Sequence, residues 1–132
     1  MTTQHLRIAR PVTDLKQSSQ IYCHGLGLQE FGEFTDHQGF SGVMLGAEGL
    51  GWHLEFTLCH THPVRPAPTE DDLLVLYIPH QPDWLFRCTS MDDAGFQRVS
   101  SFNPYWDQQG VTFIDKDAYR VVIQHGLWQP TC

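Results

Sequence analysis

The chain has 132 residues, of which 41% are hydrophobic and 17% charged, and a formal net charge of −7. These values predict one folded domain, or two small modules that share a core, and exclude a disordered chain. The longest apolar run, residues 73–78, is far shorter than the roughly 18 residues of a membrane helix, so we expect no membrane contact. The acidic balance argues against nucleic-acid binding, which requires a basic face. The N-terminus lacks the basic and apolar regions of a signal peptide, so we expect a cytoplasmic protein.

The four cysteines are scattered along the chain and form no C-x-x-C pair. This spacing predicts neither a zinc knuckle nor a thioredoxin-like motif. In a reducing compartment we expect the cysteines to act as small apolar side chains, with Cys132 a terminal bystander. They are Cys23, Cys59, Cys88 and Cys132.

The first half of the chain predicts one strand, one helix and then three strands. Thr13 is expected to cap the helix, with Asp14 in its first turn. Gly25, reinforced by Gly27, is expected to end the helix near His24. Turn residues separate the later strands. The predicted strands are residues 6–12, 28–35, 42–45 and 52–59.

The second half repeats this order. Residues 61–72 contain three prolines and no periodicity, so we predict a surface linker between a module of residues 1–60 and one of residues 73–132. Pro82 and Asp83 are expected to open the second helix, and Gly95 to end it. One helix face carries Trp84, Leu85, Cys88 and Met91. The predicted strands are residues 73–78, 96–102, 110–114 and 119–125.

The repeated order predicts an α+β fold of two tandem β-α-β-β-β modules. A single module would leave one face of its sheet open. Two modules side by side can curl their mixed sheets around a shared concave cavity. Such a cavity with a few polar groups is the usual form of a ligand site.

The paired modules resemble the vicinal oxygen chelate superfamily, which includes glyoxalase I, extradiol dioxygenases, fosfomycin-resistance enzymes and bleomycin-resistance proteins. The resemblance covers nearly the whole chain and depends on the order and spacing of several motifs. It implies the paired-module fold, a small-molecule ligand and a homodimer. The matching segments are Arg7-Ile-Ala-Arg-Pro-Val-Thr-Asp-Leu15, Tyr22-Cys-His-Gly-Leu-Gly-Leu28, Leu54-Glu-Phe-Thr57, Leu74-Val-Leu-Tyr-Ile-Pro79, Ala94-Gly-Phe96 and Asp115-Lys-Asp-Ala-Tyr-Arg-Val-Val-Ile123.

Metal sites of this superfamily usually take one ligand from the first strand and one from the last strand of each module. The matching positions hold Arg7, Glu55, Leu73 and Val122. Only Glu55 could ligate, because Leu73 and Val122 lack donor atoms and Arg7 carries a fixed positive charge. The resemblance therefore implies that the usual metal site is lost, and we expect no cofactor.

Strand alternation places Arg7 on one face of its strand and His53, Glu55 and Thr57 on one face of theirs. If the fold is that of the superfamily, Arg7 and Glu55 meet as a buried pair where the metal would lie. We expect this pair to replace the metal or to orient a polar ligand. The alternative is an internal salt bridge without a functional role.

The histidines offer a competing interpretation. His53 and Glu55 form an H-x-E pair, and His60, His62 or His5 could supply another ligand, as in a two-histidine-one-carboxylate site for iron or zinc. Linker histidines more often point into solvent, so we give this interpretation less weight.

Further ligand-binding candidates lie in the second half. Phe102-Asn-Pro-Tyr-Trp-Asp107 predicts a loop whose Tyr105 and Trp106 border the cavity; core packing or a dimer interface is an equal alternative. Tyr77 and Arg120 are expected on inward faces. Arg120 would pair with an anionic group, or else be a solvated charge at a strand end.

The leading interpretation is a metal-independent protein that binds and sequesters a ring-bearing small molecule, with an acidic balance suited to a cationic or polar ligand. The second is a lyase, isomerase or dioxygenase of the same superfamily, with a rearranged metal site or with Glu55 as a general base. The third is an interaction module whose own side chains fill the cavity. No serine or cysteine nucleophile motif is present in the sequence.

Overall fold

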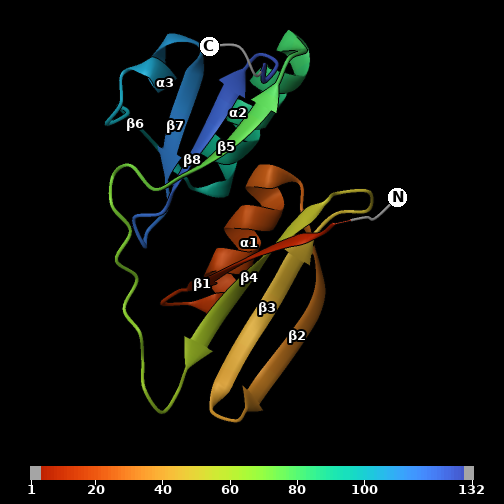
Figure 1. The fold of residues 1–132 in the computed structure, drawn as a ribbon, viewed down its shortest axis with the longest axis vertical. Helices are drawn as coiled ribbons and strands as arrows, with labels where there is room; N and C mark the ends of the chain where they lie inside the picture. The colour runs from red at the N-terminus through yellow and green to blue at the C-terminus, as the bar shows by residue number, and fades with distance from the viewer. Residues whose placement is uncertain (1–3, 130–132) are drawn as a thin grey trace. The chain divides into compact units, whose positions relative to one another are not determined.

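The computed structural model describes residues 4–129. It divides into two compact units between Pro66 and Ala67. Each unit contains a four-stranded mixed sheet with a long helix against one face (Figure 1). The predicted α+β fold of two β-α-β-β-β modules is confirmed.

The first unit contains one parallel and two antiparallel strand pairings. Its sheet has the order β1-β4-β3-β2, with β1 parallel to β4. The elements are β1 (Leu6–Pro11), α1 (Leu15–Leu26), β2 (Gln29–His37), β3 (Phe40–Gly46) and β4 (Trp52–Cys59).

The second unit repeats this topology. Its sheet has the order β5-β8-β7-β6, with β5 parallel to β8, and residues 60–72 before it form no helix or strand. The elements are β5 (Leu73–Ile78), α2 (Gln81–Ala94), β6 (Gln97–Val99), α3 (Tyr105–Gln108), β7 (Gly110–Ile114) and β8 (Arg120–His125).

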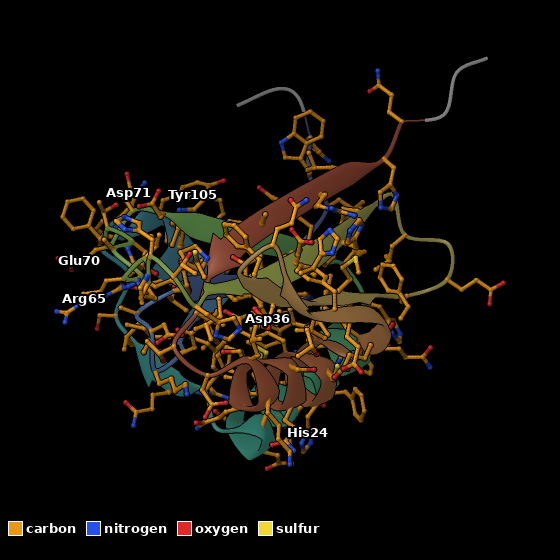
Figure 2. The ribbon with its side chains drawn as sticks, turned by 90° about the horizontal axis from the view of Figure 1, so that it is seen from below. His24, Asp36, Arg65, Glu70, Asp71 and Tyr105 are labelled. Carbon is orange, nitrogen blue, oxygen red and sulfur yellow. The ribbon has the colours of Figure 1, made fainter. Side chains whose placement is uncertain are left out.

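Both predicted ends of the first helix are wrong by one or two residues. Asp14, and not Thr13, is the N-cap, because its carboxylate accepts the backbone N–H of Gln17 over 3.0 Å. At the other end, Gly25 is buried inside α1, and Gly27 adopts the left-handed conformation at φ +70°. The helix continues past exposed His24 (Figure 2) because Leu26, two residues later, is buried in the core of the unit.

The second helix follows its predicted signals more closely. Gly95 ends α2 with φ +112°, and its N–H bonds to carbonyl oxygens of the last turn. Cys88 and Met91 are buried on the predicted face. Leu85 lies at the edge of that face and is 51% exposed.

The segment between the second helix and β7 differs most from the prediction. The strand expected over residues 96–102 is reduced to β6, and the loop expected over residues 102–107 contains the first part of the short helix α3. Pro104 precedes the first helical residue, and the side chain of Asn103 accepts the backbone N–H of Tyr105 over 3.0 Å. Local side-chain hydrogen bonding therefore starts a helical turn where the sequence pattern indicated a loop.

The core of the first unit lies between α1 and its sheet. Leu54 and Phe56 of β4 are fully buried, and the ring of Phe56 meets that of Tyr22 edge to face, with centroids 4.9 Å apart. Because side chains alternate along a strand, His53, Glu55 and Thr57 lie on the opposite face of β4. The packing of the core thus places three polar side chains on the face without a helix.

Three of the cysteines lie in the described part of the chain, and all three are free thiols. Burial raises the pKa of Cys88 and of Cys23, as expected for small apolar side chains. The hydrogen bond from Thr61 lowers the pKa of Cys59. Cys132 lies outside the described residues. Within residues 4–129, no helix has both the length and the apolar character to cross a membrane.

Candidate functional site

Arg7 and His53 are direct partners in the parallel pairing of β1 with β4. Partners in a pairing present their side chains to the same face, and the next step along places Ala9 beside Glu55. Ala9 has a small side chain, so the guanidinium of Arg7 can reach along β4 to Glu55. The open face of the first unit therefore collects a guanidinium, an imidazole and a carboxylate.

Arg7 contacts three side chains of this face. Its Nε donates to Nε2 of His53 over 3.0 Å, and its Nη1 lies 3.5 Å from Oε2 of Glu55. Its Nη2 lies 3.7 Å from Sδ of Met44 on β3. The structure brings Arg7 and Glu55 together, as the sequence predicted.

The expectation that this pair is buried is wrong. The side chain of Arg7 is 51% exposed, whereas that of Glu55 is 13% exposed. The reason is the position of β1 at the edge of its sheet, where the guanidinium lies over the face and remains open to solvent. The free energy of this ion pair is consequently reduced by solvent screening.

The hydrogen bonds of His53 determine its protonation. Nε2 of His53 accepts the N–H of Arg7, so the ring proton must lie on Nδ1. Nδ1 lies 2.6 Å from Nε2 of His5, which therefore accepts the hydrogen bond of this N–H group. Burial, together with the charge of Arg7 and the neighbouring His5, lowers the pKa of His53. His53 is thus a neutral ring with both nitrogen atoms engaged.

These contacts do not fit a metal site of the superfamily type. The lone pair of His53 that could bind a metal accepts a hydrogen bond from Arg7, and the fixed charge of Arg7 also lies beside Glu55. His60 bonds to the hydroxyl of Ser41 over 2.7 Å. Within residues 4–129, no group of three or more histidine, cysteine, aspartate or glutamate side chains is placed to hold a metal ion.

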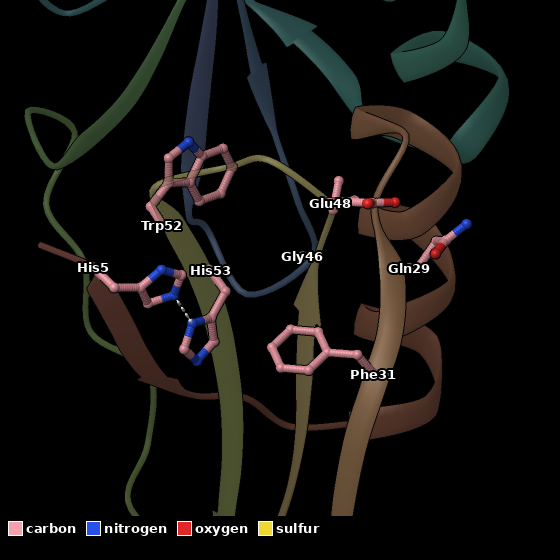
Figure 3. Close-up of a pocket in the computed structure, with 8 residues that line it drawn as sticks. His5, Gln29, Phe31, Gly46, Glu48, Trp52 and His53 are labelled. Carbon is pink, nitrogen blue, oxygen red and sulfur yellow. Dashed lines mark hydrogen bonds between the residues drawn. The ribbon is translucent and has the colours of Figure 1, made fainter. Parts of the chain in front are cut away.

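A pocket of about 250 Å³ lies beside this network (Figure 3). The ring of Phe31 meets that of His53 edge to face with centroids 5.2 Å apart, and the rings of His5 and His53 stack at 4.8 Å. The Cα of Gly46 leaves room for Phe31, because a Cβ there would lie 2.9 Å from the phenyl ring. The pocket is lined by His5, Gln29, Phe31, Gly46, Ala47, Glu48, Trp52 and His53.

The sequence analysis missed most of this lining. Phe31, Gly46 and Trp52 come from three different strands, so no single motif relates them. The structure supplies the signal that the sequence lacked: Phe31 is a large aromatic residue that is 59% exposed. An exposed ring beside a strand-end histidine is more often part of a binding surface than of a core.

Thr57 and Arg120 are each held by their own unit. The hydroxyl of Thr57 donates to the carbonyl of Arg10 over 3.3 Å, which ties β4 to β1. Arg120 is buried, with Nη1 3.3 Å from the carbonyl of Ser100 and Nη2 3.8 Å from the exposed carboxylate of Glu70. The alternative that Arg120 is a solvated charge at a strand end is therefore wrong.

The remaining candidates also lie in the second unit. Tyr77 of β5 is 37% exposed, on the sheet face that also carries Arg120. Tyr105 is 54% exposed at the surface (Figure 2) and meets half-buried Trp106 edge to face, with ring centroids 4.9 Å apart.

Both units match described domain families. Residues 6–57 match the YycE-like N-terminal domain, and residues 71–125 match the YycE-like C-terminal domain. The chain is 39% identical over 120 residues to the protein YycE of Bacillus subtilis (strain 168), which covers 91% of this chain and 86% of the relative. The crystal structure of a YycE protein of unknown function from Bacillus subtilis is similar with a TM-score of 0.87 and 36% identity, over 98% of this chain and 95% of that one.

More distant structures share the fold. The fosfomycin resistance protein FosX of Mesorhizobium loti has a TM-score of 0.71 at 12% identity, over 96% of this chain and 94% of that chain. TnmS3, an antibiotic binding protein of Streptomyces sp. CB03234, has a TM-score of 0.63 at 14% identity, over 96% and 98% of the two chains. At such identities the similarity establishes the fold alone.

Proposed function

Since the chain belongs to the YycE-like family, which has the vicinal oxygen chelate fold, we propose that it binds a ring-bearing small molecule without a metal ion. One observation carries this proposal: N–H groups of Arg7 bind Nε2 of His53 and Oε2 of Glu55, two atoms that would otherwise be free to bind a metal ion. The adjacent aromatic pocket supplies the binding surface.

The aromatic rings of the pocket favour a flat ligand. Phe31 and Trp52 supply apolar rings to the lining, while Gln29 and Glu48 supply polar groups. Apolar walls with few polar groups are typical of small-molecule sites. TnmS3 is an antibiotic binding protein with the same fold. This similarity supports the proposal that the present protein sequesters the small molecule that it binds. We further propose that the protein acts as a homodimer in the cytoplasm.

The first test is metal content, measured by elemental mass spectrometry before and after incubation with iron, zinc, nickel and manganese. We expect no metal at stoichiometric occupancy. A stoichiometric metal that resists dialysis would overturn metal independence and favour a site built on His53 and Glu55.

The second test is a thermal-shift screen of aromatic compounds, because a ligand that binds the native state raises the melting temperature. We expect stabilising compounds whose effect is weakened by Arg7→Leu and retained by Arg65→Leu, which removes an exposed linker charge. Equal shifts in the wild type and Arg7→Leu would assign Arg7 to a structural salt bridge only.

A second candidate function is an enzyme in which Glu55 is a general base. The observation that favours it is the position of this carboxylate, which is largely buried on the open face and bound by Arg7 only at 3.5 Å. Wild-type protein and the Glu55→Gln variant would be incubated in D2O with compounds from the thermal-shift screen. Deuterium incorporation at carbon by the wild type alone would support the enzyme, and its absence in both would support binding without turnover.

A further inference from the structure

We propose that the pocket beside His53 selects an organic cation that carries one or two fused aromatic rings. This inference rests on the proposed function and specifies its ligand class. It depends on the rings, the charges and the size of the pocket, each of which is taken in turn.

Aromatic faces dominate the lining. Phe31 and Trp52 contribute a phenyl and an indole ring, and the imidazole rings of His5 and His53 stack beside them. The faces of aromatic rings carry partial negative charge and attract a cation placed within about 6 Å of the ring centroid, most strongly at an indole. A flat cation can therefore gain both ring stacking and electrostatic attraction in the pocket.

Fixed charge in the lining has one sign. Glu48, in the turn between β3 and β4, is the single aspartate, glutamate, lysine or arginine among the described residues that line the pocket. His53 is neutral, because burial lowers its pKa and its Nε2 accepts the N–H of Arg7. The described lining of the pocket thus presents one carboxylate and neither lysine nor arginine.

Arg7 donates a hydrogen bond to His53 of the lining, yet its charge does not reverse the argument. It is not among the residues that line the pocket, and its guanidinium is paired with Glu55 at 3.5 Å. The net charge of the chain, −7, also raises the local concentration of cations by long-range attraction. Both the local and the overall charge consequently disfavour an anionic ligand.

The size of the pocket limits the ligand. A volume of about 250 Å³ lies below the range of about 300–1,000 Å³ typical of sites for drug-sized molecules. Gly46 cannot carry a side chain without displacing Phe31, whose ring lies against the glycine. One or two fused rings fit these dimensions.

The test uses three probes of the same ring size and different charge: N-methylquinolinium, quinoline and quinoline-4-carboxylate. Their affinities for the full-length protein are measured by isothermal titration calorimetry at mildly alkaline pH and low salt, where quinoline is neutral. We expect N-methylquinolinium to bind about tenfold more tightly than quinoline, and quinoline-4-carboxylate to bind most weakly.

Variants separate the contributions of ring and charge. Phe31→Leu should abolish most binding of every probe. Glu48→Gln should weaken binding of the cation roughly threefold and leave quinoline unchanged, because an exposed carboxylate contributes modestly. The matched control is Glu33→Gln, which removes one exposed negative charge of β2 outside the pocket and should change neither affinity.

The outcomes distinguish the ligand class from the proposed function. If quinoline or its carboxylate binds as tightly as the cation and Phe31→Leu still abolishes binding, the cation preference is overturned and the proposed pocket stands. If no probe binds the wild type, the inference is overturned together with the assignment of this pocket as the ligand site.

Discussion

Nε of Arg7 lies 3.0 Å from Nε2 of His53, across the parallel pairing of β1 with β4. This contact forces the ring proton of His53 onto Nδ1, 2.6 Å from Nε2 of His5. One arginine therefore sets the tautomer of a buried histidine and, through it, the hydrogen bond to a second histidine at the pocket. The arrangement accommodates no further proton on His53 without the loss of one of its two hydrogen bonds.

Stability should accordingly depend on pH through His53. Burial and the charge of Arg7 lower the pKa of His53 in the native state, so the unfolded chain binds more protons as the pH falls below about 6.5. The free energy of unfolding should therefore be greatest above that pH, decrease as the pH falls towards the native pKa of His53, and lose no more from this residue below it. Urea unfolding across this range checks the expectation. His53→Gln should flatten the dependence, whereas the exposed control His62→Gln should not.

Gly46→Ala should destabilise the protein by about 1 kcal/mol and weaken ligand binding. The added Cβ would lie 2.9 Å from the ring of Phe31 and 3.3 Å from Cβ of His53, so the phenyl ring must move. Chemical denaturation and the thermal-shift response measure the two effects. Gly51→Ala is the matched control, because a Cβ there meets no atom within 4 Å. Equal effects of the two substitutions would contradict the role of Gly46.

Truncation of Phe56 should mainly reduce stability, whereas truncation of Phe31 should mainly reduce ligand binding. Phe56→Ala should cost about 3–5 kcal/mol, because the ring is fully buried against Tyr22. Phe31→Ala should cost less than about 1 kcal/mol, because the ring is 59% exposed, and yet abolish ligand binding. Denaturation midpoints and thermal shifts distinguish the two roles. A large loss of stability in Phe31→Ala would make this ring a core residue and contradict its assignment to the pocket.

Asp14→Ala should lower the free energy of unfolding by about 1 kcal/mol, since it removes the side chain that accepts the N–H of Gln17 at the start of α1. Asp14→Asn retains an acceptor oxygen and should cost much less. Unfolding curves of both variants check this difference. Equal losses would indicate that Asp14 acts through its charge and not as a cap.

Local patterns of the sequence determined the elements and their faces. The bounds of β4, β5 and β7 agree with the predicted strands, because turn residues or a proline flank each of them. Alternation assigned Arg7 and Glu55 each to one face of its own strand, since the period of a strand depends on neighbouring residues only. The expectation that the two side chains meet came from the resemblance to the superfamily. The duplicated order of elements was sufficient to predict the fold of both units.

Tertiary structure decided the content of the site. The bond between Arg7 and His53 joins residues 46 positions apart, and its formation depends on the register between β1 and β4, which no local pattern specifies. The same register places the half-exposed Arg7 on an edge strand, and the packing of the second unit buries Arg120. The pocket requires residues from several strands to converge, and Gly46 contributes by the absence of a side chain. The sequence alone thus determined which polar groups face away from the core, whereas pairing and packing in three dimensions decided which of them meet.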